Sequence, residues 1–413
     1  MNKPDAVLIV GGGLLQEPLV RETLALGLLP LVTDQNPHAP AFKLPGVQPF
    51  VLDTYDIPGH AELMRDLIRM YTVRGVCTAG ADVAPTVAAA AAVAGTPGIP
   101  LEVAERTHRK PDVRIALETL ELGQYQPEWL YLNETCTQHL ETMVDAACGY
   151  PCVVKPAAER ASRGVSIVPS YHDLAAAIRK AFEYGPSYLI EEQLYGTEHS
   201  VEGIFDNDGS LLWFNTVDRF FDYSSGVPIE TGHVNPSALV PIQWEVLQTM
   251  LVDVAHALGV TWGPFKIDAL LTSDGAPKVL ECTARLSGGW DCQGTSPLTG
   301  RHPMRALLQL ACGLPVDAPL TWKPAQGYAA CAAILPQVSG TVHTLHSVKL
   351  NPNLLSGSTH SVIWAIQPDD AITPAQHNGA RSGFVLAHAS TYDGAWQRAH
   401  TAAEALAAGV EVR

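Results

Sequence analysis

Two carboxylates on either side of a short turn have the clearest chemical potential in this sequence. Asp268 and Glu281 flank Asp274-Gly275, a dipeptide typical of tight β-hairpin turns. If Ser273 pairs with Ala276, then Asp268 lies directly opposite Glu281. Opposed side chains have Cβ atoms about 4.5–5.5 Å apart, so two negative charges there need a cation between them. The spacing therefore predicts a divalent-metal site.

The surroundings of this pair indicate which metal it would hold. Oxygen ligands without a neighbouring His or Cys favour magnesium or manganese over zinc, and magnesium usually accompanies substrate phosphates. Arg285 continues the side of the strand that carries Glu281, and the small residues Ser287-Gly288-Gly289 follow, where backbone N–H groups can approach an anion. The opposite face of the hairpin is expected to be buried, with Phe265, Ile267, Ala269, Leu271, Leu280, Cys282 and Ala284. The alternative is that both acids point into water on a solvated face.

The N-terminal hundred residues have the pattern of a parallel α/β lobe. An apolar run at Ala6–Val10 ends in three glycines, a helix is expected over Leu14–Leu26, and a second apolar run follows at Leu28–Val32. Asp34 stands where a dinucleotide-binding acid would lie, but Gln16 replaces the third glycine of that fingerprint. We therefore favour a structural or substrate-facing turn over an NAD site.

The middle of the chain predicts a small α+β subdomain. A helix is expected over Leu101–Leu122, followed by a strand at Cys152–Pro156, a polar loop and a helix at Leu174–Tyr184. Further on, we expect a loop over Asp222–Pro236. The remaining elements expected are a hairpin turn at Asn207-Asp208-Gly209, a helix at Trp244–Leu258, short strands after Leu314 and a final helix at Gly394–Ala408.

Composition limits the classes of partner. The 413 residues suggest several domains, and 26 Lys and Arg against 42 Asp and Glu give a net charge of −16. This balance argues against nucleic acid or an anionic membrane as a partner, although a small anion needs only a few local cations. The eight cysteines are scattered, no basic leader or long apolar stretch occurs, and a cytoplasmic protein with reduced thiols is expected.

Taken in order, these elements resemble the ATP-grasp superfamily. The resemblance implies an α/β and α+β multidomain protein with an ATP-grasp fold and an N-terminal Rossmann-like domain that precedes the ATP-grasp domain. The implied boundaries are residues 1–105 for the N-terminal domain, 106–315 for the ATP-grasp domain with a lid at about 150–196, and 316–413 for a C-terminal lobe.

The same resemblance assigns nucleotide-binding residues. It gives Lys110 and Lys155 to the phosphates, and Glu198 to the ribose hydroxyls. The tip of the phosphate-covering lid is matched by Ser162, Arg163 and Gly164, and the adenine-binding hinge by Glu191, Glu192 and Leu194.

The hairpin then matches the magnesium-binding and phosphoryl-transfer part of the family. Asp268 and Glu281 match the metal ligands, and Arg285 matches the guanidinium that steadies the transferring phosphoryl group, with Lys155 as a second catalytic cation. Thr283 stands where the family usually has Asn, which makes it a shorter metal ligand.

A further segment points to one branch of the superfamily. Residues Glu230–Pro236 resemble the substrate loop of carboxylate-amine ligases, particularly the L-amino-acid ligases that make dipeptides. In that reading Glu230 binds an ammonium group, and His233 assists proton transfer or orientation, unless it is only a polar surface residue. Trp290 and Asp291 are expected to line the same pocket.

The resemblance implies an ATP- and magnesium- or manganese-dependent enzyme that joins a small carboxylate to an amine through an acyl phosphate. Its partners would be small molecules and a second copy in a homodimer. Two alternatives stay open. One is a bicarbonate-using carboxylase of the biotin-carboxylase or aminoimidazole-ribonucleotide type, because residues 381–388 resemble the C-terminal lobe of such carboxylases as well as that of the ligases. The other is a non-catalytic nucleotide-binding regulator.

Overall fold

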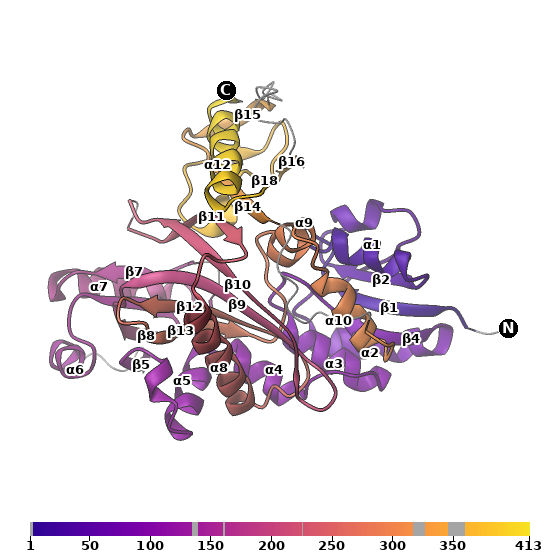
Figure 1. Ribbon diagram of the computed structural model, residues 1–413, viewed down its shortest axis with the longest axis horizontal. Coiled ribbons are helices and arrows are strands. Elements are labelled where there is room, and N and C mark those ends of the chain that lie inside the picture. The colour runs from indigo at the N-terminus through magenta and orange to yellow at the C-terminus, as the bar shows by residue number, and fades with distance from the viewer. Residues whose placement is uncertain (1–2, 134–138, 160–161, 225, 317–326, 346–359) are drawn as a thin grey trace.

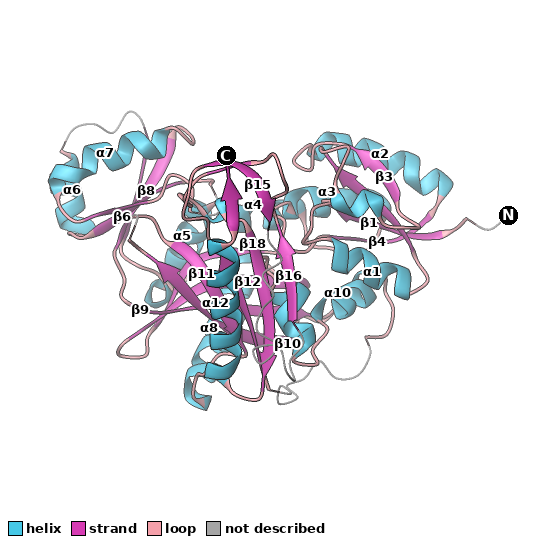
Figure 2. Cartoon of the chain, turned by 90° about the horizontal axis from the view of Figure 1, so that it is seen from above, coloured by secondary structure: helices cyan, strands magenta, loops and turns pink. Residues whose placement is uncertain are grey.

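Three lobes surround a long central sheet in the computed structural model of the chain (Figure 1). The structure describes residues 3–133, 139–159, 162–224, 226–316, 327–345 and 360–413. Cys136 lies outside these residues, whereas the other seven cysteines are free thiols. Viewed from above, the N-terminal sheet and the lid sheet lie at opposite ends, with the central sheet between them (Figure 2).

The N-terminal lobe is the expected parallel α/β unit. Its sheet has the order β3-β2-β1-β4. Because β1 is buried on both faces, it appears in the sequence as a continuous apolar run. The strands are β1 (Asp5–Val10), β2 (Leu29–Asp34), β3 (Gln48–Val51) and β4 (Thr72–Cys77); the helices are α1 (Glu17–Ala25), α2 (Ile57–Met70) and α3 (Ala84–Ala94).

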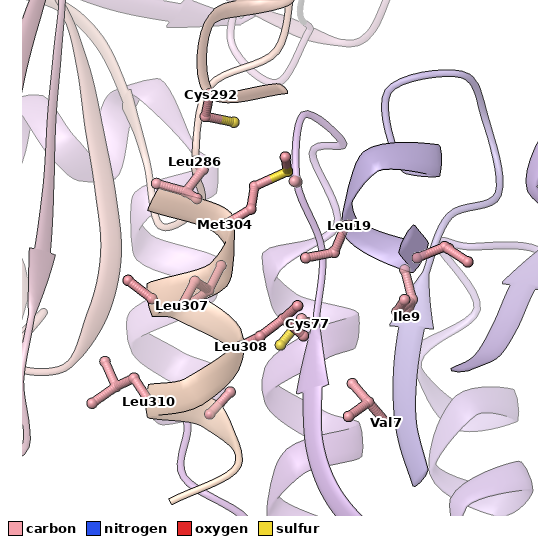
Figure 3. Close-up of a cluster of buried hydrophobic side chains, with 14 of the residues drawn as sticks. Val7, Ile9, Leu19, Cys77, Leu286, Cys292, Met304, Leu307, Leu308 and Leu310 are labelled. Atoms are coloured by element: carbon pink, nitrogen blue, oxygen red, sulfur yellow. The ribbon is translucent and has the colours of Figure 1, made fainter. Parts of the chain in front are cut away.

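A helix from much later in the chain covers one face of this sheet. It is α10 (Pro303–Ala311), whose Leu308 and Met304 lie in the same buried cluster as Val7 and Ile9 (Figure 3). The contact is close, because a Cβ on Gly75 would approach the carbonyl oxygen of Ala311 to 2.8 Å. This packing attaches the N-terminal lobe to the central lobe.

The glycine turn after β1 is used internally. Gly12 N donates to Asp34 Oδ2 at 2.8 Å, and Gln16 Nε2 donates to the carbonyl oxygen of Ala79 at 2.7 Å. The Gln16 side chain also lies against Gly11, where an added Cβ would meet it at 3.2 Å. These contacts agree with a structural turn.

The lid is the expected α+β subdomain, with sheet order β5-β8-β6-β7. The single helix expected over Leu101–Leu122 is instead two helices, because Pro111 has no N–H to donate to the carbonyl one turn earlier and the chain is extended at Arg109. These two helices, α4 (Leu101–His108) and α5 (Lys110–Thr119), precede the lid and pack against α3, α8 and β13. The lid elements are β5 (Trp129–Asn133), α6 (Leu140–Ala147), β6 (Cys152–Pro156), β7 (Ser166–Val168), α7 (Tyr171–Phe182) and β8 (Ser187–Glu192).

The central sheet has eight strands in the order β13-β12-β9-β10-β11-β14-β18-β16. It therefore continues across the predicted boundary at residue 315, since β11 pairs with β14. Its core-facing helix is α8 (Pro241–Leu258). The strands are β9 (Gly196–Phe205), β10 (Leu211–Asp222), β11 (Ile229–Asn235), β12 (Gly263–Thr272), β13 (Pro277–Thr283), β14 (Tyr328–Ile334), β16 (His360–Trp364) and β18 (Gly383–Ala389).

One expectation was wrong here. The segment expected as part of a loop, Glu230 to Asn235, forms β11 and is hydrogen-bonded to strands on both sides. Polar residues obscured the strand pattern, because two of them, Glu230 and His233, face a cavity rather than a hydrophobic core. Strand placement fixes Glu230 and His233 more firmly than a loop would.

The C-terminal lobe packs one Ala-rich helix, α12 (Tyr392–Ala408), against β14 and β18. A second small sheet joins β15 (Gly340–Leu345), β17 (Ala371–Ile372) and β19 (Val410–Val412). Within the described part of the chain, no helix combines the length and apolar character needed to cross a membrane.

Candidate active site

The two carboxylates are paired as predicted. Asp268 on β12 lies opposite Glu281 on β13, and Lys266 lies opposite Thr283. The turn itself differs, because Thr272 N donates to the carbonyl oxygen of Ala276 at 3.0 Å and three residues rather than two reverse the chain. A β-bulge directly after Asp268 then shifts the register back by one residue. The longer turn and the bulge each shift the register by one residue, in opposite directions, so Asp268 still pairs with Glu281.

The bulge changes which apolar residue faces the core. Val279, not Leu280, belongs to the buried cluster beneath the hairpin. Leu280 lines the nucleotide-sized cavity described below, together with Leu270. The expectation for Leu280 was wrong because the count assumed an unbroken two-residue period.

Each carboxylate already has its own cationic partners. Asp268 Oδ1 accepts from Lys266 Nζ at 2.6 Å and lies 2.7 Å from Arg219 NH1. Glu281 Oε1 lies 3.4 Å from Lys110 Nζ. Sequence analysis missed Arg219 because it comes from a different strand, β10. Lys266 lies two residues before Asp268 on the same face of β12, so the alternation of side chains along the strand could have identified it.

The oxygen donors at the hairpin fit a divalent cation. Asp268, Glu281 and Thr283 line one cavity, and the Thr283 hydroxyl is buried without a hydrogen-bond partner among the described residues. A buried hydroxyl normally has a partner, so this oxygen is available to a metal ion or its water. Two carboxylates with further oxygen donors suit magnesium or manganese, which take their remaining ligands from substrate phosphates and water.

A cavity of about 540 Å³ lies between the lid and the central sheet. It is large enough for a nucleotide, and the hairpin acids Asp268 and Glu281 are at its wall. Of the residues predicted for nucleotide binding, those that line it are Lys110, Lys155, Ser162, Arg163, Glu191, Glu192, Leu194 and Glu198.

Gly164, the remaining predicted lid residue, is required by the backbone conformation and the space at its position. Its φ is +71°, and an added Cβ would lie 2.6 Å from Pro156 Cγ and 2.7 Å from Tyr184 Cδ2. Only glycine fits this backbone and this space. It shapes the lid that carries Ser162 and Arg163.

Glu191 anchors two cations. Its Oε2 lies 2.5 Å from Lys155 Nζ, and its Oε1 accepts from Arg114 Nε at 3.0 Å. Burial lowers the pKa of Lys155 to about 8, even though Glu191 favours its charged form. Burial opposes the charge of Glu191 too, but Arg114 and Lys155 hold its pKa below the ordinary value. Glu191 therefore orients Lys155 and Arg114 at the cavity wall. Its contact with adenine stays a prediction.

Glu198 lines the same cavity, and its side chain has a defined orientation. Its Oε1 accepts from the Tyr223 hydroxyl at 2.7 Å. Burial raises the pKa of Glu198, although Arg219 opposes this shift. Its contact with a ribose stays a prediction.

A second cavity of about 220 Å³ adjoins the hairpin. Among its lining residues are Asp268, Glu281, Thr283, Arg285, Glu230, His233, Ser287 and Asp291. Arg285 is oriented by Asp82 of the N-terminal lobe, whose Oδ1 accepts from Arg285 Nε at 2.8 Å and lies 2.7 Å from NH2. Burial opposes the charge of Arg285, but Asp82 raises its pKa overall.

Glu230 lines this cavity with its charge already balanced. Arg219 donates to both of its oxygens at 3.1 Å, and Arg381 NH1 lies 3.4 Å from Oε2. Glu230 therefore holds Arg219 in place beside Asp268. Its binding to an ammonium group stays a prediction.

His233 and Trp290 lie deeper than expected. Burial lowers the pKa of His233 to about 4, and its Nε2 is 3.3 Å from Thr295 Oγ1, so the ring is neutral at pH 7. Trp290 packs in a hydrophobic cluster beside Phe384 instead of contacting the cavity, so its expected lining role is corrected. The next residue, Asp291, lines the cavity.

A loop of the C-terminal lobe connects the two cavities. Asn378 Oδ1 accepts from Glu230 N at 2.8 Å, and Asn378 Nδ2 donates to Ser162 Oγ of the lid at 3.2 Å. Asn378 lines both cavities. No motif in the sequence marked it.

Comparison with known proteins agrees with this architecture. Residues 148–293 match the family described as ATP-grasp domain. The D-alanine--D-alanine ligase of Halorhodospira halophila is 33% identical over 141 residues, which are 34% of this chain and 46% of that protein. The chain thus matches less than half the length of this curated relative.

Two solved structures share the whole fold. The L-amino acid ligase from Bacillus licheniformis has a TM-score of 0.78, 21% identity and 97% coverage of both chains. The carboxyaminoimidazole ribonucleotide synthase from Aspergillus clavatus, solved with ATP, has a TM-score of 0.72, 18% identity and covers 98% of this chain and 99% of its own. The sequence match over residues 148–293 and the shared architecture therefore show that the chain contains an ATP-grasp domain and has the ATP-grasp fold.

Proposed function

We propose that the protein is an ADP-forming carboxylate-amine ligase. The observation that carries the proposal is the joining of two cavities at Asp268 and Glu281, which line both. One cavity has the size and cationic residues for a nucleotide, and the other has space for a small substrate. The metal-binding acids therefore lie where a γ-phosphate would meet a substrate carboxylate.

Activation is necessary because a carboxylate does not react with an amine at neutral pH. A substrate carboxylate oxygen attacks the γ-phosphorus of ATP, the bond to ADP breaks, and an acyl phosphate remains. Lys110, Lys155 and Arg285 neutralise the charge that develops during this transfer. Magnesium, held by Asp268 and Glu281 with Thr283 nearby, would supply further charge neutralisation at the phosphates.

The second step forms the amide. The amine attacks the acyl carbon, phosphate leaves, and the amine loses a proton. The lid, with Ser162 bonded to Asn378 of the C-terminal lobe, excludes water that would hydrolyse the intermediate. The neutral His233 holds its orientation through Thr295 rather than carrying charge into the site.

The experiment is an ADP-release screen over pairs of amino acids and other small acids and amines, with mass spectrometry of the product. The proposal predicts ADP, phosphate and a product joined by an amide. Release of AMP and pyrophosphate would contradict the acyl-phosphate mechanism.

The alternative is a carboxylase that phosphorylates bicarbonate. The likeness to the carboxyaminoimidazole ribonucleotide synthase structure favours this candidate. ADP formation that depends on bicarbonate, and not on an amino acid, would support it over the ligase.

A further inference from the structure

Asn378 contacts both halves of the site from a third part of the fold. It begins the short 3-10 turn η4 (Asn378–Ala380) of the C-terminal lobe and lines both cavities. Its Nδ2 donates to Ser162 Oγ of the lid at 3.2 Å, and its Oδ1 accepts from the backbone N of Glu230 at 2.8 Å. One side chain therefore joins the cover of the nucleotide cavity to the wall of the substrate cavity.

The turn that carries Asn378 is held by contacts of its own. Gly379 N donates to His377 Nδ1 at 3.1 Å, and Arg381 Nε donates to the carbonyl oxygen of Asn378 at 2.7 Å. The Arg381 guanidinium also lies over the ring of Phe384, 5.0 Å from its centroid. Asn378 therefore has a fixed position within the C-terminal lobe, to which the lid can bond.

The lid residue at this contact has an unfavourable backbone conformation. The φ of Ser162 is +62°, in the left-handed region that residues with a side chain rarely adopt. Such a conformation persists where surrounding contacts hold it, and it occurs often at ligand clamps. The bond from Asn378 is partly shielded from water and is a contact of this kind. The lid tip is therefore built to meet the C-terminal lobe at this point.

The same contacts continue to the metal-binding hairpin. Both carboxylate oxygens of Glu230 accept from Arg219 at 3.1 Å, and Arg219 NH1 lies 2.7 Å from Asp268 Oδ1. A lid that opens and closes is an element with two arrangements, so a bond made in only one of them can link nucleotide binding to the reacting centre. Asn378 makes such a bond.

We propose that Asn378 is a positioning residue that bonds the closed lid, so that one side chain controls both how long the nucleotide stays bound and how much of the acyl phosphate reaches the amine. The second effect rests on the proposed ligase function. Without the bond the lid opens early and admits water. A water oxygen then attacks the acyl carbon in place of the amine, the bond to phosphate breaks, and the free acid, phosphate and a proton are released.

The first measurement needs no reaction. ADP with a methylanthraniloyl fluorophore on its ribose is bound with Mg²⁺ and chased with unlabelled ADP in a stopped-flow instrument. Asn378→Ala and Ser162→Ala should each speed its release about five- to tenfold, the loss of one hydrogen bond. The double variant should be little faster than either, because both changes remove the same bond.

Asn207→Ala is the matched control. The Asn207 side chain also accepts one hydrogen bond, from Trp262 Nε1 at 3.1 Å, but it lies in the β9–β10 turn among residues that line neither cavity. Its release rate should match wild type. Wild-type release in either single variant, or additive effects in the double variant, would overturn the role of Asn378; two variants in different lobes keep the test valid if one fails to fold.

The second measurement is the ratio of ADP released to amide formed, with the acid and amine that the screen identifies. Wild type should give a ratio near one, whereas Asn378→Ala and Ser162→Ala should release several ADP for each amide and change kcat for ADP formation much less. A ratio that stays near one in both variants would overturn the effect on the acyl phosphate. If no pair of substrates gives ADP, the ligase function fails, while the release rates still test the bond between lid and C-terminal lobe.

Discussion

Arg285, just beyond the hairpin, is held by Asp82 from a different lobe, with Nε 2.8 Å from Oδ1. The bond joins the loop after β4 to the second residue after β13. A backbone bond from Gly80 N to the carbonyl oxygen of Leu286 at 3.2 Å runs alongside it. The N-terminal lobe therefore positions Arg285, to which we assign a catalytic role, in addition to lining the cavity.

Asp82→Asn should lower kcat about tenfold or more and change KM for ATP much less, because Arg285 loses the charge that orients it toward the transferring group. Steady-state kinetics of ADP formation measure this split. Asp66→Asn, at an exposed surface pair in the same lobe, is the control and should match wild type. A change in KM for ATP with kcat unaltered would show that Asp82 does not act through Arg285.

The pKa of Lys155 predicts two opposite pH trends. Because its charge is lost as pH rises through about 8, KM for ATP should increase above that pH. The unfolded chain keeps this proton up to about 10.5, so it binds more protons than the folded protein between these values, and stability should rise with pH there.

Nucleotide titrations and urea unfolding from pH 7 to 10.5 check both trends. Lys155→Arg keeps the charge and should remove both, while Lys155→Met should bind ATP weakly at every pH. A Lys155→Arg protein with the same pH dependence as wild type would assign the trends to another group.

Gly164→Ala should destabilise the lid and raise KM for ATP. The substitution adds the cost of a positive φ, about 1 kcal/mol, and a clash with Pro156 and Tyr184, which overpacking data place at about 1–3 kcal/mol more. Gly149→Ala is the matched control, since Gly149 also has a positive φ but open space around its Cβ. Thermal unfolding with and without ATP should therefore show the larger loss for Gly164; equal losses would mean that the clash is relieved.

Local patterns predicted the parts of the site that depend on one hairpin. The alternation around Asp274-Gly275 placed Asp268 opposite Glu281, even though the turn and a bulge each moved the register by one residue. The βαβ pattern likewise predicted the N-terminal sheet. Such features depend on neighbouring residues and turn chemistry, which a single sequence contains.

Long-range partners could not be predicted in the same way. Asp82 is 203 residues from Arg285, and Asn378 is 216 residues from Ser162. Only tertiary packing brings such pairs together. The strand β11 was missed for a related reason, because Glu230 and His233 face a cavity and break the hydrophobic pattern that marks a buried strand.

The central claim is that Asp268 and Glu281 jointly hold a divalent cation beside the nucleotide. Electron paramagnetic resonance of Mn²⁺, titrated into the protein with ADP present, measures that binding directly. We predict that Asp268→Asn and Glu281→Gln each weaken nucleotide-dependent Mn²⁺ binding at least about tenfold, and that the double variant is little worse than either. Mn²⁺ affinity equal to wild type in both single variants would contradict the account.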